Sequence, residues 1–281
     1  MTRLRDALLA PTLLDLTAID SRDTPGLPEG ADKDDAQDAL LECGDRLSEL
    51  QEILFANGRA GVTRRSVLVV LQGMDTAGKG GVMRKVAGLL DPQGLAITAF
   101  GRPTDEELRH DFLWRIEKRL PPPGRIGVFD RSHYEDVLVP RVRGDLDAEE
   151  LERRFTAITE FEDAYVRGGG VLMKCFLHID PADQAERLRS RLDDPTKHWK
   201  YDPGDLADRA RWAEFRAANE EAIERTSKAT TPWFVVPSGR KWYRNWAVAT
   251  LLLETLQGLD LDWPTADFDV EAEKARLESM T

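Results

Sequence analysis

The sequence has few of the features that mark secreted, membrane-bound or metal-cluster proteins. Its 281 residues include two cysteines, Cys43 and Cys175, each in an apolar stretch and without the spacing of a metal site. We therefore expect a reducing, cytoplasmic setting. No apolar run approaches the length of a membrane span, and the first residues lack the apolar core of a signal peptide, so no membrane role is expected.

Nucleophile motifs, paired histidines and excess positive charge are also missing. The chain has no Gly-x-Ser-x-Gly turn, and its 4 histidines show no spacing typical of metal ligands, so we expect them to be non-catalytic. Its 39 lysines and arginines are outnumbered by 51 acidic residues, which gives a net charge of −12. This charge argues against nucleic acid as a partner and requires a local basic cluster for any anionic substrate.

The chain does contain a candidate phosphate-binding loop. The apolar run VLVVL, which begins at Val67, is typical of a buried parallel strand. The pattern Gly-x-x-x-x-Gly-Lys follows at Gly73, Gly78 and Lys79, and a periodic apolar segment then predicts a helix. Loop amides and the helix N-terminus can hold phosphate oxygens, and Lys79 supplies a full positive charge. A glycine-rich turn that merely joins strand and helix is the alternative.

The loop departs from the usual pattern at Gly80, where Ser or Thr normally offers a hydroxyl to Mg²⁺. The metal must then be held by another group, and Asp75 is the nearest candidate. The other loop and helix residues expected to contact phosphate are Gly73, Met74, Thr76, Ala77, Gly78, Gly80, Gly81 and Arg84.

Alternating apolar runs and amphipathic segments predict an α/β fold. Further strands are expected at 95–100, 126–129, 171–179 and 233–236. The intervening helices are expected to begin near Thr104, Asp147, Pro181, Asp205 and Trp242. This alternation predicts a three-layer fold with one five-stranded parallel sheet flanked by helices.

No linker divides the sequence into two domains. Residues 1–33 are expected to form an arm, which either docks on the body or a partner subunit or is a disordered tail. The main domain is expected at 34–265; it opens with a helix at 34–55 that Asn57 and Gly58 end. An acidic tail at 266–281 completes the chain.

A second acidic group is expected at the end of the third strand. Asp130 follows this strand, and ligands of open α/β sheets bind beyond the carboxyl ends of the strands. Arg131 can bridge phosphates with two parallel hydrogen bonds, and Glu135 adds acid where a metal would lie. We interpret Asp75 and Asp130 as metal ligands and Tyr134 as a packing residue. A surface ion pair is the alternative role for Arg131 and Glu135.

The densest positive patch of this acidic chain follows the fourth strand. Arg187 and Arg191 lie four residues apart on one helical face, and Lys197, His198 and Lys200 follow a proline turn. A basic segment here is typical of the lid of nucleotide kinases, which excludes water during phosphoryl transfer. We expect a lid at 187–210 whose basic residues bind phosphate. A solvated helix face is the alternative.

Three motifs jointly resemble those of the family-2 polyphosphate kinases. They are GMDTAGKGG at 73–81, FDRSHYEDVLV at 129–139 and RLDDPTKHWKYDPGD at 191–205. A further stretch, WFVVPSGRKWYRNWAV at 233–248, extends the match. The resemblance implies a thymidylate-kinase-like P-loop kinase fold with a helical lid, dependence on Mg²⁺ with Mn²⁺ as a substitute, and a homodimer or homotetramer.

The implied reaction is reversible phosphoryl transfer between inorganic polyphosphate and nucleotides. Asp75 and Asp130 match the family's metal-linked carboxylates, Lys79 its P-loop lysine and Arg131 its phosphate-bridging arginine. The acidic Glu135, with His-Trp-Lys in the lid, resembles members that phosphorylate both AMP and ADP, yielding ATP. The guanine nucleotides GMP and GDP are further expected acceptors. Members restricted to nucleoside diphosphates tend to carry Asn in place of this glutamate.

Three functions remain open from the sequence. The first is a polyphosphate-dependent nucleotide kinase that uses AMP and ADP or only one of these acceptor classes. The second is an ATP-dependent nucleoside monophosphate kinase, which needs a pocket for the base of its donor. The third is a non-catalytic sensor, against which the intact Asp75, Lys79 and Asp130 argue. The missing P-loop hydroxyl favours the first.

Overall fold

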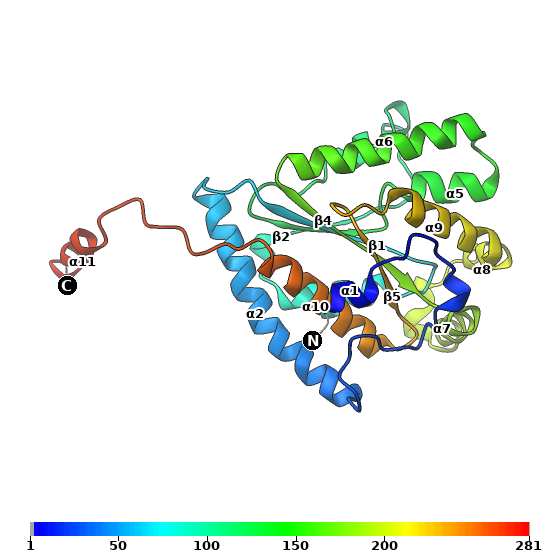
Figure 1. Ribbon diagram of the computed structural model, residues 1–281, viewed down its shortest axis with the longest axis horizontal. Helices are drawn as coiled ribbons and strands as arrows, with labels where there is room; N and C mark the ends of the chain where they lie inside the picture. The colour runs from blue at the N-terminus through cyan, green and yellow to red at the C-terminus, as the bar shows by residue number, and fades with distance from the viewer. Residues whose placement is uncertain (1–2, 281) are drawn as a thin grey trace.

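The central element is a parallel sheet between two helical layers, as Figure 1 shows for the computed structural model, which describes residues 3–280. The sheet has 5 strands in the order β2-β3-β1-β4-β5. Their bounds are β1 Ser66–Gln72, β2 Leu95–Ala99, β3 Ile126–Asp130, β4 Gly170–His178 and β5 Trp233–Pro237. All 7 residues of β1 are buried, because β3 and β4 flank it and helices cover both faces. The predicted α/β P-loop kinase fold is confirmed.

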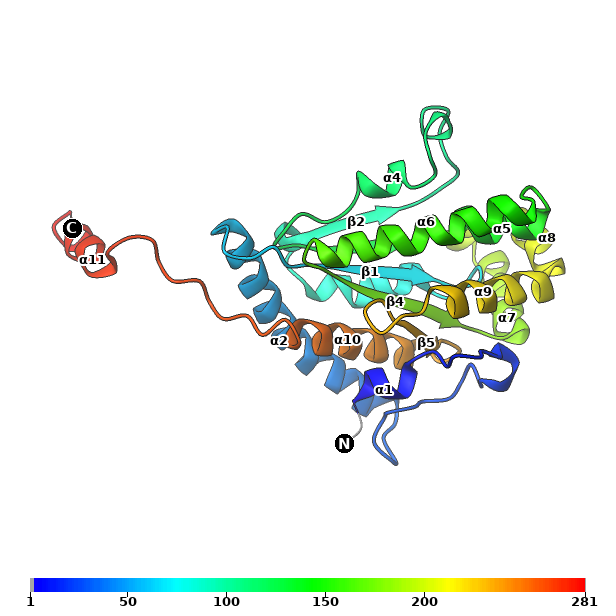
Figure 2. The same cartoon turned by 45° about the horizontal axis from the view of Figure 1, so that its top comes forward.

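Each face of the sheet has its own helical layer and hydrophobic core. One layer consists of α2 (Lys33–Arg59), α3 (Lys79–Lys85) and α10 (Lys241–Gln257). The other consists of α5 (Glu135–Arg143), α6 (Ala148–Arg167) and α9 (Trp212–Thr226). Beyond the carboxyl ends of the strands lie α7 (Pro181–Asp193) and α8 (Gly204–Ala210) (Figure 2). None of the helices in residues 3–280 has both the length and the apolar character of a membrane span.

The N-terminal arm packs on the body. Its helix α1 (Leu4–Leu8) buries Leu4 and Leu8, and the amides of Leu4 and Arg5 donate to the Glu254 carboxylate at 2.9 and 3.1 Å. Further along the arm, Leu14 and Leu16 are buried in the second core. Short 3-10 turns occur at Leu16–Ala18, Ala87–Leu89, Pro92–Gly94, Glu107–Arg109 and Pro195–Lys200.

The single helix predicted from Thr104 is wrong. The capping box does form, since the Thr104 amide donates to Glu107 Oε2 at 2.8 Å and the Glu107 amide to Thr104 Oγ1 at 3.3 Å. It leads only into the 3-10 turn η4 (Glu107–Arg109). The Asp111 side chain then accepts the amide two residues on, and a separate helix α4 (Trp114–Glu117) follows. A second local cap therefore divides the segment.

Two other helix predictions also need correction. Asn57 and Gly58 lie inside α2, because the Asn57 side chain donates to Ile53 O at 2.9 Å and Gly58 packs against Gly124. A Cβ at Gly58 would lie 2.4 Å from Gly124 Cα, which explains the glycine better than a helix end. Asp205 lies within α8 and does not cap it, and the helix expected there is divided at Arg211 into α8 and α9.

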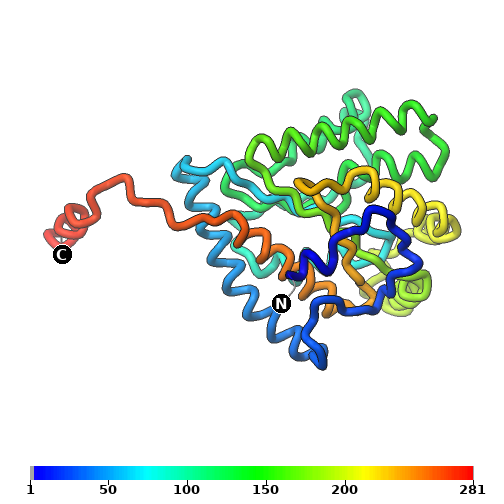
Figure 3. Tube along the Cα trace, viewed as in Figure 1, coloured from blue at the N-terminus to red at the C-terminus, as the bar shows by residue number. Residues whose placement is uncertain are grey.

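The C-terminal tail stands apart from the body. After α10, an extended connector leads to α11 (Val270–Glu278), which Figures 1 and 3 show well away from the sheet and its layers. Every residue from 265 to 280 is exposed. The tail therefore makes no contribution to either hydrophobic core.

Candidate active site

A cleft of about 910 Å³ lies beyond the carboxyl ends of β1, β2 and β3. Its walls come from the P-loop, the segment after β2, the start of α5 and helix α8, which lies in the predicted lid. The predicted site residues that line it are Gly73, Met74, Asp75, Lys79, Arg131 and Glu135. The structure thus brings together the loop and the β3 end, which are far apart in the sequence.

The P-loop follows a tight path in which two glycines take left-handed backbone conformations. Gly73 has φ 148° and Gly78 has φ 114°, both in the left-handed region. A Cβ at Gly78 would lie 1.8 Å from Arg244 Nη1, so an arginine closely supports the loop from beneath. Lys79, at the first turn of α3, is 9% exposed and donates to Gly73 O at 2.8 Å. The lysine is thereby held across the loop, beside the backbone predicted to hold phosphate oxygens.

Two guanidinium groups support the loop, that of the half-buried Arg187 and that of the buried Arg244. Arg187 Nη1 donates to Thr76 O at 2.8 Å and Ala77 O at 3.0 Å, and Arg244 Nη1 donates to Ala77 O at 3.4 Å. Burial, with the charge of Arg187 nearby, lowers the pKa of Arg244 to about 10. In residues 3–280 no carboxylate forms an ion pair with either group. Their positive charge favours an anion on the loop.

Two further cations near the loop, Arg244 and Lys241, were not predicted as site residues. Burial, followed by the charges of Arg187 and Arg244, lowers the pKa of Lys241, so these three cations lie close together. Both residues lie in the stretch 233–248, whose basic residues could have been predicted as phosphate contacts. Arg187 was expected to contact phosphate directly, but its side chain hydrogen-bonds loop carbonyls and does not line the cleft.

Three carboxylates surround Arg131 at the end of β3. Its Nη2 lies 2.9 Å from Asp75 Oδ1, and its Nη1 lies 3.6 Å from Glu135 Oε2. Arg131 has φ 64°, and its amide donates to Leu71 O at 3.1 Å, which turns the side chain into the cleft. Burial alone would lower the pKa of Arg131, but Glu135, Asp75 and Asp130 together raise it. Burial raises the pKa of Glu135 against the opposing charges of Arg131 and Lys79.

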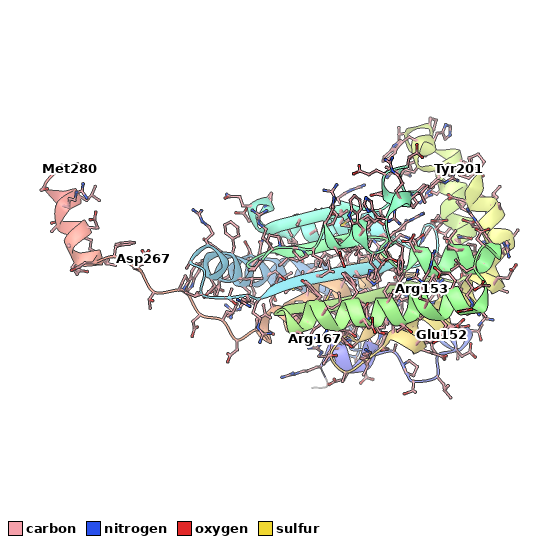
Figure 4. All side chains as sticks on the ribbon, turned by 90° about the horizontal axis from the view of Figure 1, so that it is seen from above. Glu152, Arg153, Arg167, Tyr201, Asp267 and Met280 are labelled. Atoms are coloured by element: carbon pink, nitrogen blue, oxygen red, sulfur yellow. The ribbon has the colours of Figure 1, made fainter. Side chains whose placement is uncertain are left out.

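Most basic side chains of the predicted lid contact groups within that same segment. Arg191 Nη1 donates to Lys200 O at 2.8 Å and lies 3.2 Å from Asp205 Oδ2. Lys197 Nζ lies 2.8 Å from the half-buried Asp194 carboxylate. The ring of His198 shares a hydrogen bond of 2.8 Å with Leu192 O. Figure 4 shows this part of the chain around Tyr201, at the end of the molecule away from the tail.

The residues of the predicted lid that line the cleft include three aspartates and no lysine or arginine, which was not predicted. Asp202, Asp205 and Asp208 line it. Burial and the charge of Asp75 raise the pKa values of Asp205 and Asp208. The predicted role of the lid cations as phosphate contacts remains a prediction.

Comparison with known proteins decides the family. The model of the family described as polyphosphate kinase 2 (PPK2) matches residues 30–262. The chain belongs to the polyphosphate kinase 2 family. The resemblance drawn from the motifs is thus confirmed, as is the expectation of a kinase.

Relatives within the PPK2 family match most of this chain. The AMP/ADP-polyphosphate phosphotransferase of Meiothermus ruber is 42% identical over 89% of this chain and 91% of its own length. The ADP-polyphosphate phosphotransferase of Rhodopseudomonas palustris is 37% identical over 78% of each chain. The crystal structure of polyphosphate kinase 2 from Arthrobacter aurescens TC1 superposes with a TM-score of 0.95 at 50% identity, over 99% of this chain and 97% of that one.

The carboxylates of this PPK2 chain fit a magnesium ion. Asp130 is half-buried, and no hydrogen bond or ion pair occupies its side chain in residues 3–280. Nothing lies within 4 Å of a Cβ built at Gly80, so no side chain replaces the missing hydroxyl there. Residues 3–280 hold no cluster of three metal-binding side chains. Mg²⁺ is usually bound by one or two carboxylates together with phosphates and water, so Asp75 and Asp130 match its needs.

A buried polar network fixes the segment between Asp130 and Glu135. Lys174 of β4 and Glu162 of α6 form an ion pair of 2.6 Å inside the protein. Tyr134 Oη donates to Glu162 Oε1 at 2.6 Å, and the His133 ring lies 3.2 Å from the same oxygen. Tyr134 is fully buried, so its predicted packing role is confirmed. The network anchors the backbone from which Arg131 and Glu135 reach the cleft.

Proposed function

We propose that the protein transfers phosphoryl groups from inorganic polyphosphate to AMP and ADP, forming ADP and ATP. The observation that carries the proposal is that Lys79 lies between a cluster of cations and a cleft. Beneath and beside the loop lie the cations Arg187, Lys241 and Arg244, while the cleft on the other side is large enough for a nucleotide. The names of the Meiothermus ruber and Rhodopseudomonas palustris relatives support these substrates.

The donor would bind along the P-loop. Polyphosphate is a linear polyanion without a base, so it needs a series of cations and backbone amides rather than an apolar pocket. Lys241 and Arg244 extend the positive charge beyond Lys79, in a chain whose net charge is −12. Such a local cluster can hold a polyanion against the overall field.

The acceptor would occupy the cleft. Its volume of about 910 Å³ lies within the range usual for small-molecule sites, and Phe100, Phe112 and Leu138 offer apolar surface for a base. Arg131 lies where the acceptor phosphate approaches the loop. Arg115 also lines the cleft and is held by Asp136 at 2.9 Å. Purine recognition through apolar contact favours acceptance of GMP and GDP as well.

Catalysis would consist of positioning and charge stabilisation. Lys79 and Arg131 would both contact the phosphoryl group while it is transferred. The lid would exclude water that competes for this group. Bound Mg²⁺, with Mn²⁺ as a substitute, neutralises phosphate charge and would be held by Asp75 and Asp130. Each turnover breaks one phosphoanhydride bond and forms another, so we propose that transfer is reversible. A cytoplasmic setting, expected from the free thiols, belongs to this proposal.

An ATP-dependent nucleoside monophosphate kinase is the second candidate, because the chain has another cavity beside the P-loop. This cavity of about 560 Å³ shares Met74 with the cleft and is lined by Phe176, His178 and Trp212. Aromatic walls of this kind could take the base of a nucleotide donor.

The test is an acceptor series with polyphosphate and Mg²⁺. AMP, ADP, GMP and GDP are each incubated with the purified protein, and the products are separated. We expect ADP and then ATP from AMP, with the guanine nucleotides also converted. Lys79→Met serves as the inactive control. Absence of any nucleotide product at saturating polyphosphate would contradict the proposed function.

A further inference from the structure

Residues 260–280, which lead into and include the C-terminal tail, carry large apolar side chains that are exposed to solvent. Trp263 is 52% exposed, Phe268 60% and Met280 75%. Between residues 260 and 280 there are seven acidic and two basic side chains, a net charge of −5. An isolated helix as short as α11, with 9 residues, is only marginally stable in water. Docking on a partner surface would therefore stabilise α11.

A matching surface lies at the amino ends of the strands. We call it the amino-end arginine patch; its members are Arg59, Arg64, Arg65, Arg125 and Arg167. The Gly124 amide donates to Arg65 O at 2.8 Å, and a Cβ at Gly169 would lie 2.8 Å from Arg64 O, so these segments are in contact. Arg125 is half-buried and the other four are exposed. None of them forms an ion pair in residues 3–280.

We propose that the tail of one copy docks on the amino-end arginine patch of a second copy. Arginines can pair with the carboxylates of Asp262 and Asp267, and guanidinium planes can stack on Trp263 and Phe268. Arginines without an ion pair and an acidic, aromatic tail are complementary in charge. A polyphosphate chain on the patch would leave these aromatic side chains exposed.

The direction of the tail favours a second copy over the chain's own patch. Asn57 Nδ2 donates to Asp262 O at 2.7 Å, which fixes the start of the tail beside the end of α2. From there the chain runs outward, and Asp267 and Met280 lie far from the body in Figure 4. The match with the Arthrobacter aurescens structure covers 99% of this chain, so it includes α11. The family model ends at residue 262, so the tail is an addition to the part that it matches.

The test uses two charge-reversed variants of the full chain. The patch variant is Arg64→Glu with Arg65→Glu, and the tail variant is Asp262→Arg with Asp267→Arg, whose side chains form no hydrogen bond or ion pair in residues 3–280. Molar mass is measured by light scattering after size exclusion at low salt. We expect each variant alone to have half the molar mass of the parent. An equimolar mixture should regain the parent mass, because both contacts between unlike copies are then complementary.

The matched control is Arg3→Glu with Lys33→Glu, two exposed cations away from the patch, which should keep the parent mass. A mixture that stays dissociated, or variants with the parent mass, would overturn the inference. A patch variant that keeps its mass but binds long polyphosphate more weakly would show a polyanion site instead. Turnover of AMP is measured in parallel, so loss of assembly is distinguished from failure of the proposed function.

Discussion

Replacing Lys174 by methionine should be among the most damaging single changes outside the cleft. Its Nζ donates to Glu162 Oε2 at 2.6 Å, Thr226 O at 2.9 Å and Tyr134 Oη at 3.1 Å, and the side chain is 0% exposed. Methionine fills a similar volume but leaves the Glu162 carboxylate buried without its cation. Removal of one partner of a buried pair costs about 3–5 kcal/mol, which we expect for Lys174→Met.

The assay is urea unfolding followed by circular dichroism. A matched control is Lys228→Met, which removes an ion pair of 2.7 Å between Lys228 and Asp163. Asp163 follows Glu162 on helix α6. Both members of that pair are more than a third exposed, so the control should lose no more than about 1 kcal/mol. Equal losses from Lys174→Met and Lys228→Met would refute the reasoning.

Lowering the pH should reduce the loss of stability that Lys174→Met causes. In the parent, burial would raise the pKa of Glu162, but Lys174 and His133 hold it below its ordinary value of 4.5. Its contribution to stability is therefore present above pH 4.5 and lost below. In the variant, burial acts without Lys174 and raises the pKa of Glu162, so the penalty for the buried charge grows as pH rises. We expect a smaller difference between variant and parent at pH 5 than at pH 7.5, and a constant difference would argue against a buried charge.

The remaining predictions concern the cleft and the lid. Asp75→Asn and Asp130→Asn should each abolish turnover without changing the far-ultraviolet circular dichroism, because each removes a carboxylate proposed to hold Mg²⁺. Neutralising Lys197 and Lys200 together should raise KM for polyphosphate more than KM for nucleotide, and added salt should shrink the effect. Glu135→Asn should lower kcat/KM for AMP about tenfold more than for ADP, a difference of about 1.4 kcal/mol, because asparagine cannot balance Arg131 when a phosphate is missing.

Each of these predictions has a clear contrary result. Near-parent activity of either aspartate variant at ordinary Mg²⁺ would remove that residue from the metal site. Equal changes in both KM values, independent of salt, would show that Lys197 and Lys200 have a structural role in the lid and do not bind polyphosphate. A parallel loss on AMP and ADP would give Glu135 a general role.

The parts of the site that were predictable are those encoded locally. The P-loop needs a strand, two glycines and a lysine within a few residues, and Asp130 and Arg131 follow directly from the end of a buried strand. The carboxyl ends of parallel strands meet at one edge, so their proximity follows from the fold class. For these residues, the residues next to them in the sequence determine the backbone conformation.

The parts that were missed depend on contacts between distant segments. The helical periodicity predicted that Arg187 and Arg191 share one face of α7. It could not predict that Arg187 donates to P-loop carbonyls more than a hundred positions away in sequence. Helix α5 escaped prediction because Pro140 lies inside it. The lysine within the apolar strand β4 was a signal that could have been used, since a buried cation requires a partner such as Glu162.

The measurement that tests the central claim most directly is the choice of donor. ADP formation from AMP and Mg²⁺ is followed with polyphosphate as the only donor and, separately, with ATP as the only donor. We predict that polyphosphate supports turnover without added ATP and that kcat/KM for ATP is lower by at least about tenfold, or about 1.4 kcal/mol in transition-state stabilisation. Turnover that requires ATP and ignores polyphosphate would contradict the account and assign the cavity beside Met74 to the base of a nucleotide donor.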